Sequence, residues 1–489
     1  MSSPEVVVIG AGPAGLTAAY ELSKEGIGTT IVEKDPSEVG GIARTVNYKG
    51  YRFDIGGHRF FTKIPEVNRI WQEILADEFI TRPRLSRIFY RGKFFSYPLK
   101  PFEALANIGI VDSAHVGMSY LWAKLFPSKE EVNFEQWVSN RFGYKLYSMF
   151  FKTYTEKVWG MPCTELGADW AAQRIQNLSL FTAVKNAFFG KKGDTSVKTL
   201  IDQFEYPRLG PGQMWERCRD IVRERGHVLH FGRDIRAVHH ANGEVTGVTT
   251  VDAEGRTERI PCNRVVSSMP LSQLARVLDP PPPAEVLAAA DALKYRDFLT
   301  ISLVVDQEEL FPDNWIYIHS PDVQMGRIQN FKNWSPDMVP DASKTCLGLE
   351  YFVFEGNELW NSPDDRLVEL GASEVDKLKL ASKGDVEDGT VVRMPKAYPV
   401  YDSKFQAAVR TLRSWFTEAL PDVQPVGRNG QHRYNNQDHS MLTSVLAVRN
   451  ILGERHDVWN VNEDEEYHET MDRGVPRRVS DPPSTPATT

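Results

Sequence analysis

Cysteine is scarce in this sequence. The four cysteines among 489 residues are widely separated, and no two of them form a Cys-x-x-Cys pair. This sparse pattern excludes a disulfide-stapled scaffold, gives no zinc-ligand spacing, and is typical of proteins from a reducing compartment. The sequence therefore predicts no structural disulfide, no metal site and a cytoplasmic location.

Long apolar runs and an excess of positive charge are also missing. No stretch of about 18 uncharged apolar residues occurs, so no membrane span is expected. The apolar segment Leu105–Phe126 is interrupted by charged residues and predicts a buried or amphipathic helix. The opening Met1–Glu5 lacks the basic region of a signal peptide. A net charge of −8 lacks the electrostatic footprint of a general nucleic-acid binder.

Length and composition leave a globular protein of about three domains or lobes, with an apolar fraction of 41%. Its oligomeric state is left open by the composition. The tail 474–489 is rich in Pro, Ser and Thr, and we expect it to be disordered.

A glycine-rich turn near the N-terminus is the first motif that carries chemistry. An apolar run, Val6–Ile9, leads into Gly-Ala-Gly-Pro-Ala-Gly, and then come a helical stretch, Ala14–Glu25, and a second strand, Thr29–Glu33. Glycines in this place let the backbone approach a pyrophosphate, and the helix N-terminus attracts its charge. The acidic residue that ends the second strand can accept bonds from a ribose diol. The predicted dinucleotide contacts are Gly10, Gly12, Pro13, Ala14, Gly15, Glu33 and Lys34.

Two pairs of glycines follow this motif. Gly40 and Gly41 precede Arg44, and Gly56 and Gly57 precede His58. Glycine pairs let the chain pass close to a flat ring, and an arginine offers charge-assisted bonds to phosphate. This extended pattern resembles FAD enzymes of the amine oxidase and glutathione reductase type and implies FAD as the cofactor. A histidine in an ordinary turn is the alternative at His58.

Several segments in chain order resemble UDP-galactopyranose mutases, beginning with the Gly-Gly-His stretch itself. The matches span roughly residues 5–455. The last of them, with Gly-Arg, Tyr and then Asn-Gln-Asp-His-Ser, is the most specific. The other matching segments are Arg82–Leu99, Tyr154–Arg174, Tyr206–Trp215, Arg327–Pro336, Ala397–Pro399 and Gly427–Met441.

The resemblance implies an α/β fold with three parts. A Rossmann-type FAD-binding domain would be discontinuous, made from 1–85, 206–295 and 395–460. Residues 86–205 would form a mainly helical lobe, and residues 296–394 an antiparallel β-sheet substrate lobe. Short β-rich segments between 228 and 268, separated by turn signals, predict a meander within the FAD domain.

The activity implied by the resemblance is that of a flavin-dependent pyranose/furanose mutase acting on a nucleotide-diphosphate sugar. Reduced FAD would supply N5 as the nucleophile toward the anomeric carbon, with NAD(P)H as the expected reductant. The expected catalytic residues are His58, beside N5, with Arg327 and Arg174 flanking the diphosphate. Further FAD contacts are expected from Arg428, Asp438, His439 and Ser440, and substrate contacts from Tyr97, Lys100, Trp159, Arg174, Arg327, Tyr398 and Tyr434.

Alternatives remain open at several of these positions. Trp159 is nearly as well explained as a core residue, and Asp438 as the N-cap of the last helix. Lys100 stands where the eukaryotic-type mutases carry an amide, and Trp334 where they carry a tyrosine, so the nucleotide and the sugar are undetermined. An oxidoreductase of the same superfamily, which takes a hydride from an amine or polyene, is the competing function, and a non-catalytic FAD-binding protein is the third.

Overall fold

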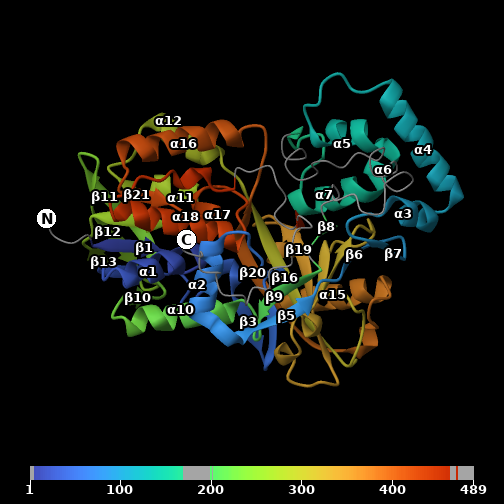
Figure 1. The fold of residues 1–489 in the computed structure, drawn as a ribbon, viewed down its shortest axis with the longest axis horizontal. Coiled ribbons are helices and arrows are strands. Elements are labelled where there is room, and N and C mark those ends of the chain that lie inside the picture. The colour runs from blue at the N-terminus through green and yellow to red at the C-terminus, as the bar shows by residue number, and fades with distance from the viewer. Residues whose placement is uncertain (1–4, 169–198, 201, 463–469, 472–489) are drawn as a thin grey trace, which may run out of the picture.

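The computed structural model describes residues 5–168, 199–200, 202–462 and 470–471. Its largest parts are a parallel sheet with helices, a seven-stranded mixed sheet and a helical lobe (Figure 1). The predicted tail 474–489 lies outside the described residues.

The parallel sheet has five strands in the order β10-β2-β1-β14-β21. The strands come from distant parts of the chain: β1 Val6–Ile9, β2 Thr29–Val32, β10 Val228–His230, β14 Arg264–Ser267 and β21 Val423–Pro425. Central strands of such sheets are buried on both faces, which explains the continuous Val and Ile runs of β1 and β14. Helix α1 (Pro13–Lys24) packs against both α10 (Gly212–Glu224) and α18 (Gln437–Ile451).

A small meander lies beside this sheet. It pairs β11 (Asp234–Ala241), β12 (Glu244–Val251) and β13 (Thr257–Ile260) in antiparallel order. Two of the short segments expected in the meander join the parallel sheet instead, as β10 and β14. β10 pairs parallel with β2, and β14 pairs parallel with β1. Both strands therefore extend the parallel sheet and are not part of the meander.

The mixed sheet has the order β20-β16-β19-β18-β17-β6-β7. All its pairings are antiparallel except that of β17 with β6. One face is apolar and forms a core that includes residues of α15 (Asp364–Lys377). The strands are β6 Ser86–Tyr90, β7 Lys93–Ser96, β16 Tyr295–Val305, β17 Trp315–Ile318, β18 Arg327–Asn330, β19 Thr345–Val353 and β20 Val386–Pro399.

The strands β6 and β7 fall inside the stretch expected to belong to the helical lobe. Arg91 and Gly92, both with positive φ, form the tight turn between them. Two consecutive positive-φ residues are the geometry of a two-residue hairpin loop. The hairpin therefore extends the mixed sheet, and the helices of the lobe begin only at Pro101.

The helical lobe contains α3 (Pro101–Ile108), α4 (Ile110–Leu125), α5 (Phe134–Phe142), α6 (Tyr144–Tyr147) and α7 (Thr153–Trp159). The expected helix over Leu105–Phe126 is divided at Gly109, whose φ of +86° ends α3. None of the described helices is long and apolar enough to cross a membrane.

Shorter elements connect these parts. They are β3 Thr45–Tyr48, β4 Tyr51–Asp54, α2 Pro65–Leu75, β5 Phe79–Pro83, β8 Thr199–Leu200, β9 Gln203–Pro207, α11 Leu271–Arg276, β15 Leu278–Asp279, α12 Ala284–Ala292, α13 Phe331–Trp334, α14 Glu358–Asn361, α16 Phe405–Ala419, α17 Gly427–Gly430 and β22 Thr470–Met471.

Candidate active site

The glycine turn between β1 and α1 is packed backbone against backbone. A Cβ on Gly15 would lie 1.8 Å from the carbonyl oxygen of Gly10, so only glycine fits there. Gly10 has φ +92°, a conformation that favours glycine. No side chain caps α1, whose first residue is Pro13. The turn therefore leaves the N-terminal N–H groups of α1 without a side-chain partner, which suits a pyrophosphate.

Glu33 is fixed at the end of β2, next to this turn. Its carboxylate accepts hydrogen bonds from the N–H of Ala11 at 2.6 Å and of Asp35 at 2.8 Å. Burial raises its pKa. Lys34 instead turns to the surface and pairs with Asp234 at 2.8 Å, with both side chains largely exposed.

The Gly40-Gly41 segment runs against the glycine turn. The N–H of Gly40 donates to the carbonyl of Ala11 at 2.8 Å, and a Cβ on Gly41 would lie 3.5 Å from the Cα of Gly12. Arg44 pairs with Asp35 at 2.5 Å. The first two motifs of the sequence therefore form one continuous surface of backbone and short side chains.

The C-terminal block meets the same turn. A Cβ on Gly427 would lie 2.8 Å from the Cβ of Ala14, and Ser440 is the next nearest residue. Asn436 caps α18 and shares a capping box with His439, so the interpretation of Asp438 as the N-cap is wrong. Asp438 lies within the first turn, where its carboxylate accepts the hydroxyl of Thr62 at 3.0 Å.

His58 is held neutral. Its Nδ1 lies 3.2 Å from the carbonyl oxygen of Gly56, and because a carbonyl only accepts, Nδ1 carries the proton and Nε2 the lone pair. Burial, assisted by the positive charges of Arg428 and Arg327, lowers its pKa to about 3. Next to it, a Cβ on Gly57 would lie 3.2 Å from the Trp334 ring, so this position has little room for a side chain.

Arg327 stands on the polar face of the mixed sheet. In the strand register it lies between Tyr317 on β17 and Glu350 on β19. Glu350 is fully buried, forms an ion pair with Arg327, and accepts a hydrogen bond from Gln329 at 2.6 Å. This carboxylate raises the pKa of Arg327, so the guanidinium stays charged despite burial.

Two tyrosines complete this cluster. The hydroxyl of Tyr398 lies 3.4 Å from Nη2 of Arg327, and its ring stacks on Tyr434 with centroids 5.7 Å apart. Burial raises the pKa of Tyr398 to about 12, so its hydroxyl keeps its proton. The guanidinium of Arg428 lies 5.2 Å and 4.8 Å from these two rings and donates to the carbonyl of Asn435.

Aromatic residues continue from Arg327 toward the helical lobe. Tyr317 packs against Tyr97 at 4.8 Å and against Tyr154 at 5.6 Å, and Tyr154 stacks on His319 at 4.8 Å. Trp315 lies under the guanidiniums of Arg59 and Arg84. These contacts place aromatic surface and positive charge on one side of Arg327.

Glu350 and Tyr317 belong to this cluster but stand in no recognisable sequence motif. The one signal for Glu350 is a carboxylate in the otherwise uncharged strand Thr-Cys-Leu-Gly-Leu-Glu-Tyr-Phe-Val. A charged side chain in a strand that is buried at every position needs a partner that compensates its charge. The sequence of the strand does not show which residue that partner is.

Three expected substrate residues lie elsewhere or are not described. Trp159 has 3% of its surface exposed and packs on Tyr401 in the core of the helical lobe, as its alternative interpretation predicts. Lys100 is exposed at the start of α3. Arg174 lies outside the described residues. Within the described ranges, no group of three or more His, Cys, Asp or Glu residues could hold a metal ion.

Comparison with known proteins confirms the fold and the family. A crystal structure of reduced UDP-galactopyranose mutase matches with a TM-score of 0.79 and 21% identity, covering 94% of this chain and 98% of that one. At this identity the likeness shows the α/β fold.

Two curated relatives are similar in sequence. The 1-hydroxycarotenoid 3,4-desaturase of a Flavobacterium species is 23% identical over 280 residues, 53% of this chain and 56% of the relative. A probable UDP-galactopyranose mutase of Klebsiella pneumoniae is 26% identical over 188 residues, 35% of this chain and 44% of the relative. The chain thus spans about half the length of these relatives.

The family model described as flavin containing amine oxidoreductase matches residues 13–421. This match covers most of the chain and includes helix α1, the His58 loop and the Arg327 strand. The protein is therefore an FAD-dependent enzyme that belongs to the flavin containing amine oxidoreductase family.

Proposed function

We propose that this protein is a flavin-dependent pyranose/furanose mutase acting on a nucleotide-diphosphate sugar. The observation that carries the proposal is the charged cluster of Arg327, Glu350, Tyr398 and Tyr434, next to the neutral His58. A guanidinium kept charged inside the protein, with a phenolic donor at its side, suits a diphosphate.

The residues around the glycine turn fit FAD. The uncapped start of α1 suits the pyrophosphate, and the fixed carboxylate of Glu33 suits a ribose diol. Gly40, Gly41 and Arg44, together with Arg428, Asp438, His439 and Ser440, would complete the binding surface. In its reduced form, FAD supplies the nucleophile for the anomeric carbon, and NAD(P)H is the proposed reductant.

The protein side chains have a limited task in this reaction. The bond between the anomeric carbon and the diphosphate breaks and forms again after the ring has reclosed through another hydroxyl, so mass and oxidation state do not change. Arg327 and the Tyr398 hydroxyl would hold the negative charge of the released diphosphate. His58 offers an unprotonated Nε2, and its Nδ1–H bond to Gly56 fixes the ring orientation.

A redox function is the second candidate. The family name and the sequence similarity to a carotenoid desaturase favour an enzyme that takes a hydride from its substrate with oxidised FAD. Such an enzyme would favour an apolar tunnel, and the buried charges around Arg327 count against it.

The test compares oxidised and dithionite-reduced enzyme on a panel of nucleotide-diphosphate sugars, with products separated by chromatography and detected by mass. A new peak of unchanged mass, formed only with reduced flavin, supports the mutase. If all sugars stay inert in both states, while an amine or polyene bleaches the oxidised flavin under anaerobic conditions, the redox function replaces it.

Arg327→Leu is the informative variant in this test, and Arg276→Leu, at an exposed ion pair with Asp291, is the matched control. We expect the first to lose product formation and the second to keep it, with the flavin spectrum of both unchanged.

A further inference from the structure

Helix α7 contains a lysine, Lys157, that has no role in the proposed function. It belongs to the mutase-like segment Tyr154–Arg174, of which Trp159 lies in a core and Arg174 lies outside the described residues. Figure 1 shows α7 on the side of the helical lobe that faces the mixed sheet, and α7 contacts β19. Lys157 is therefore placed where the helical lobe and the sheet meet.

The ammonium group of Lys157 is bonded to backbone. Its Nζ donates to the carbonyl oxygens of Ser320 at 2.7 Å, Met325 at 3.0 Å and Ile318 at 3.3 Å. An ammonium has three N–H donors and no acceptor, so these bonds use its whole donor capacity. Ile318 ends β17, and the other two carbonyls belong to residues 319–326, which we call the β17–β18 loop.

These carbonyls flank the strand pair that carries Arg327. Tyr317 and Arg327 are partners in the register of β17 and β18, and theirs is the pair nearest the loop. Ile318 directly follows Tyr317, and Met325 stands two residues before Arg327, so Lys157 joins the two strands just beyond this pair. The end of a hairpin ladder opens more easily than its middle. A bond across this end therefore restricts the positions of both side chains.

Tyr154 contacts the same end of the hairpin. It stands three residues before Lys157, so the two side chains project from one face of α7. The Tyr154 ring stacks on His319 with centroids 4.8 Å apart and meets the Tyr317 ring edge-on at 5.6 Å. One face of α7 thus supports the hairpin with an aromatic ring and a charged donor.

A carboxylate holds the β17–β18 loop from α15, the helix on the apolar face of the mixed sheet. Glu374 accepts the N–H groups of Gln324 at 2.5 Å and of Met325 at 3.0 Å. It also accepts the hydroxyl of Tyr351 at 3.0 Å. Met325 is thus bonded to Glu374 through its N–H and to Lys157 through its carbonyl. Two side chains of opposite charge, from two different elements, fix one loop through its backbone.

We propose that Lys157 is a positioning residue of the candidate active site, which holds Arg327 and Tyr317 in place through the β17–β18 loop. Its bonds are to backbone carbonyls, so it acts through the loop and not on a substrate. A displacement of about 1 Å in a group that orients the reacting molecule can lower a rate about a hundredfold. The consequence for turnover rests on the proposed function, whereas the hold on the loop does not.

Helix α7 has a second anchor, which allows the side chain of Lys157 to be tested by itself. Arg296 of β16 donates to the backbone carbonyls of Lys157 and Val158, at 3.2 Å each. These bonds cap the end of α7, where a positive charge is favourable, and they do not involve the ammonium group. A variant that lacks the ammonium should therefore keep α7 on the sheet and change the loop.

Hydrogen exchange followed by mass spectrometry, on the FAD-loaded full chain, tests the hold on the loop. Lys157→Met removes the ammonium and keeps an unbranched side chain, and we expect the amides of residues 319–326 to exchange at least about tenfold faster. Lys377→Met is the matched control, because Lys377 donates to the carbonyl of Asp322 in the same loop, at 2.7 Å, from an exposed position. It should change the exchange by less than about threefold. Unchanged exchange in Lys157→Met overturns the proposal.

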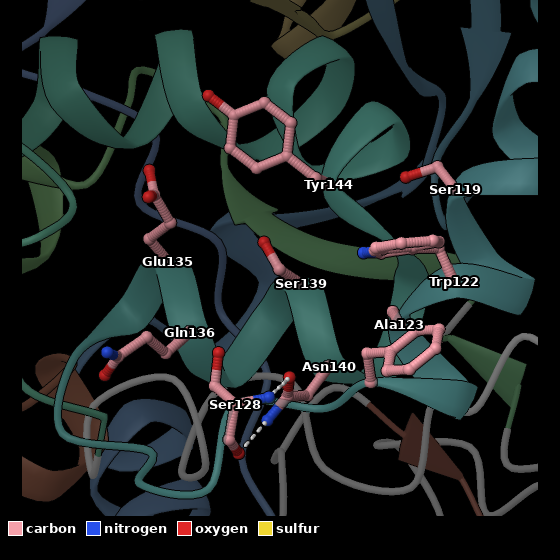
Figure 2. Close-up of a pocket in the computed structure, with 10 residues that line it drawn as sticks. Ser119, Trp122, Ala123, Ser128, Glu135, Gln136, Ser139, Asn140 and Tyr144 are labelled. Carbon is pink, nitrogen blue, oxygen red and sulfur yellow. Dashed lines mark hydrogen bonds between the residues drawn. The ribbon is translucent and has the colours of Figure 1, made fainter.

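Helix α5 is the internal reference of this measurement. Figure 2 shows Glu135, Ser139 and Asn140 of α5 beside a hollow of about 240 Å³, together with Tyr144 of α6. The described residues that line this hollow include none from α7 or from the β17–β18 loop. Exchange in α5 should therefore stay as in the wild type. An equal rise there would mean that Lys157→Met loosens the whole lobe, which contradicts the proposal.

Turnover separates positioning from stability. With a nucleotide-diphosphate sugar that the wild type converts, kcat per bound FAD should fall at least about tenfold in Lys157→Met, with an unchanged flavin spectrum. Lys157→Arg, which keeps the charge and several donors, should recover most of it, and Lys377→Met should match the wild type. Faster loop exchange with an unchanged kcat would make Lys157 purely structural and overturn the proposal. A wild type that converts no such sugar refutes the proposed function instead, and the loop exchange then decides whether Lys157 holds the hairpin.

Discussion

The candidate active site has two halves, a cofactor half around the glycine turn and a substrate half around Arg327. They differ in the kind of contact that holds them together. Around the glycine turn the contacts are between backbone atoms, with Gly15 against the carbonyl of Gly10 and Gly40 bonded to Ala11. Around Arg327 they are between side chains, with Glu350, Gln329 and Tyr398 supplying charge and hydrogen bonds. The glycine turn of the cofactor half therefore depends on the absence of side chains, whereas the Arg327 cluster depends on their presence.

Both halves contain titratable groups whose pKa values are shifted by burial. His58, His319 and Tyr398 all have pKa values shifted by burial, and all belong to the substrate half or its border. In the cofactor half, burial raises the pKa of Glu33. Substitutions should consequently affect the two halves independently, which the following four predictions test.

The largest effect is expected at Arg327. Arg327→Leu leaves the buried carboxylate of Glu350 without its cation, which costs about 3–5 kcal/mol of unfolding free energy. The double variant Arg327→Leu/Glu350→Leu should recover most of that stability, measured by urea unfolding, because no unpaired charge remains. It should not recover turnover, and FAD content should stay normal throughout. Regained turnover in the double variant would show that Arg327 has a structural role alone.

Gly15 should be the most sensitive position of the cofactor half. Gly15→Ala places a Cβ 1.8 Å from a backbone oxygen and should destabilise the apoprotein by about 3 kcal/mol. Gly12→Ala is the control, since its Cβ would meet nothing closer than 3.9 Å, and it should cost under about 1 kcal/mol. Thermal unfolding of both apoproteins measures the difference. Equal costs would mean that the turn tolerates side chains.

Acid should destabilise the protein through the substrate half. His319 is buried and neutral, with its pKa lowered to about 3. An unfolded histidine has a pKa near 6.5, so the stability contributed by His319 is complete above that value and falls with pH down to about 3. At pH 5 the loss is about 2 kcal/mol. Urea unfolding at pH 7.5 and at pH 5 measures the loss of unfolding free energy between the two pH values. In His319→Gln the part of this loss that comes from His319 should be absent.

The smallest effects are expected at two neighbouring residues that directly follow β2. Glu33→Gln should weaken FAD binding about tenfold, because a charged acceptor becomes a neutral amide. Lys34→Ala removes an exposed ion pair with Asp234 and should change stability by at most about 0.5 kcal/mol. FAD titration by fluorescence quenching measures the binding of both. If Lys34→Ala lowered the FAD affinity as much as Glu33→Gln does, Lys34 would be a cofactor-binding residue.

Much of the cofactor half could be predicted from the sequence. The glycine turn and Glu33 lie within one strand–turn–helix–strand unit, where local geometry fixes their relative positions. The last helix, α18, begins at Gln437. The interpretation of Asp438 as its cap was wrong because Asn436, with extended backbone angles, precedes the first turn.

The substrate half could be predicted only in part. Resemblance to a family singled out Arg327, Tyr398 and Tyr434, and the structure brings these three together, while their roles stay predictions. Glu350 and Tyr317 had no recognisable motif, and Trp159 lies in a core. The hairpin of β6 and β7 was assigned to the helical lobe because its pairing with β17 joins residues more than 220 positions apart.

The sequence by itself determined the backbone surface for the dinucleotide, since a positive φ or a missing Cβ is a property of one residue and its neighbours. Only the tertiary structure decided that Arg327 meets Glu350 across β18 and β19, that Tyr398 reaches it from β20, and that α4 is exposed. These relations depend on strand register and on what packs against a helix, and both are set by parts of the chain far away in sequence.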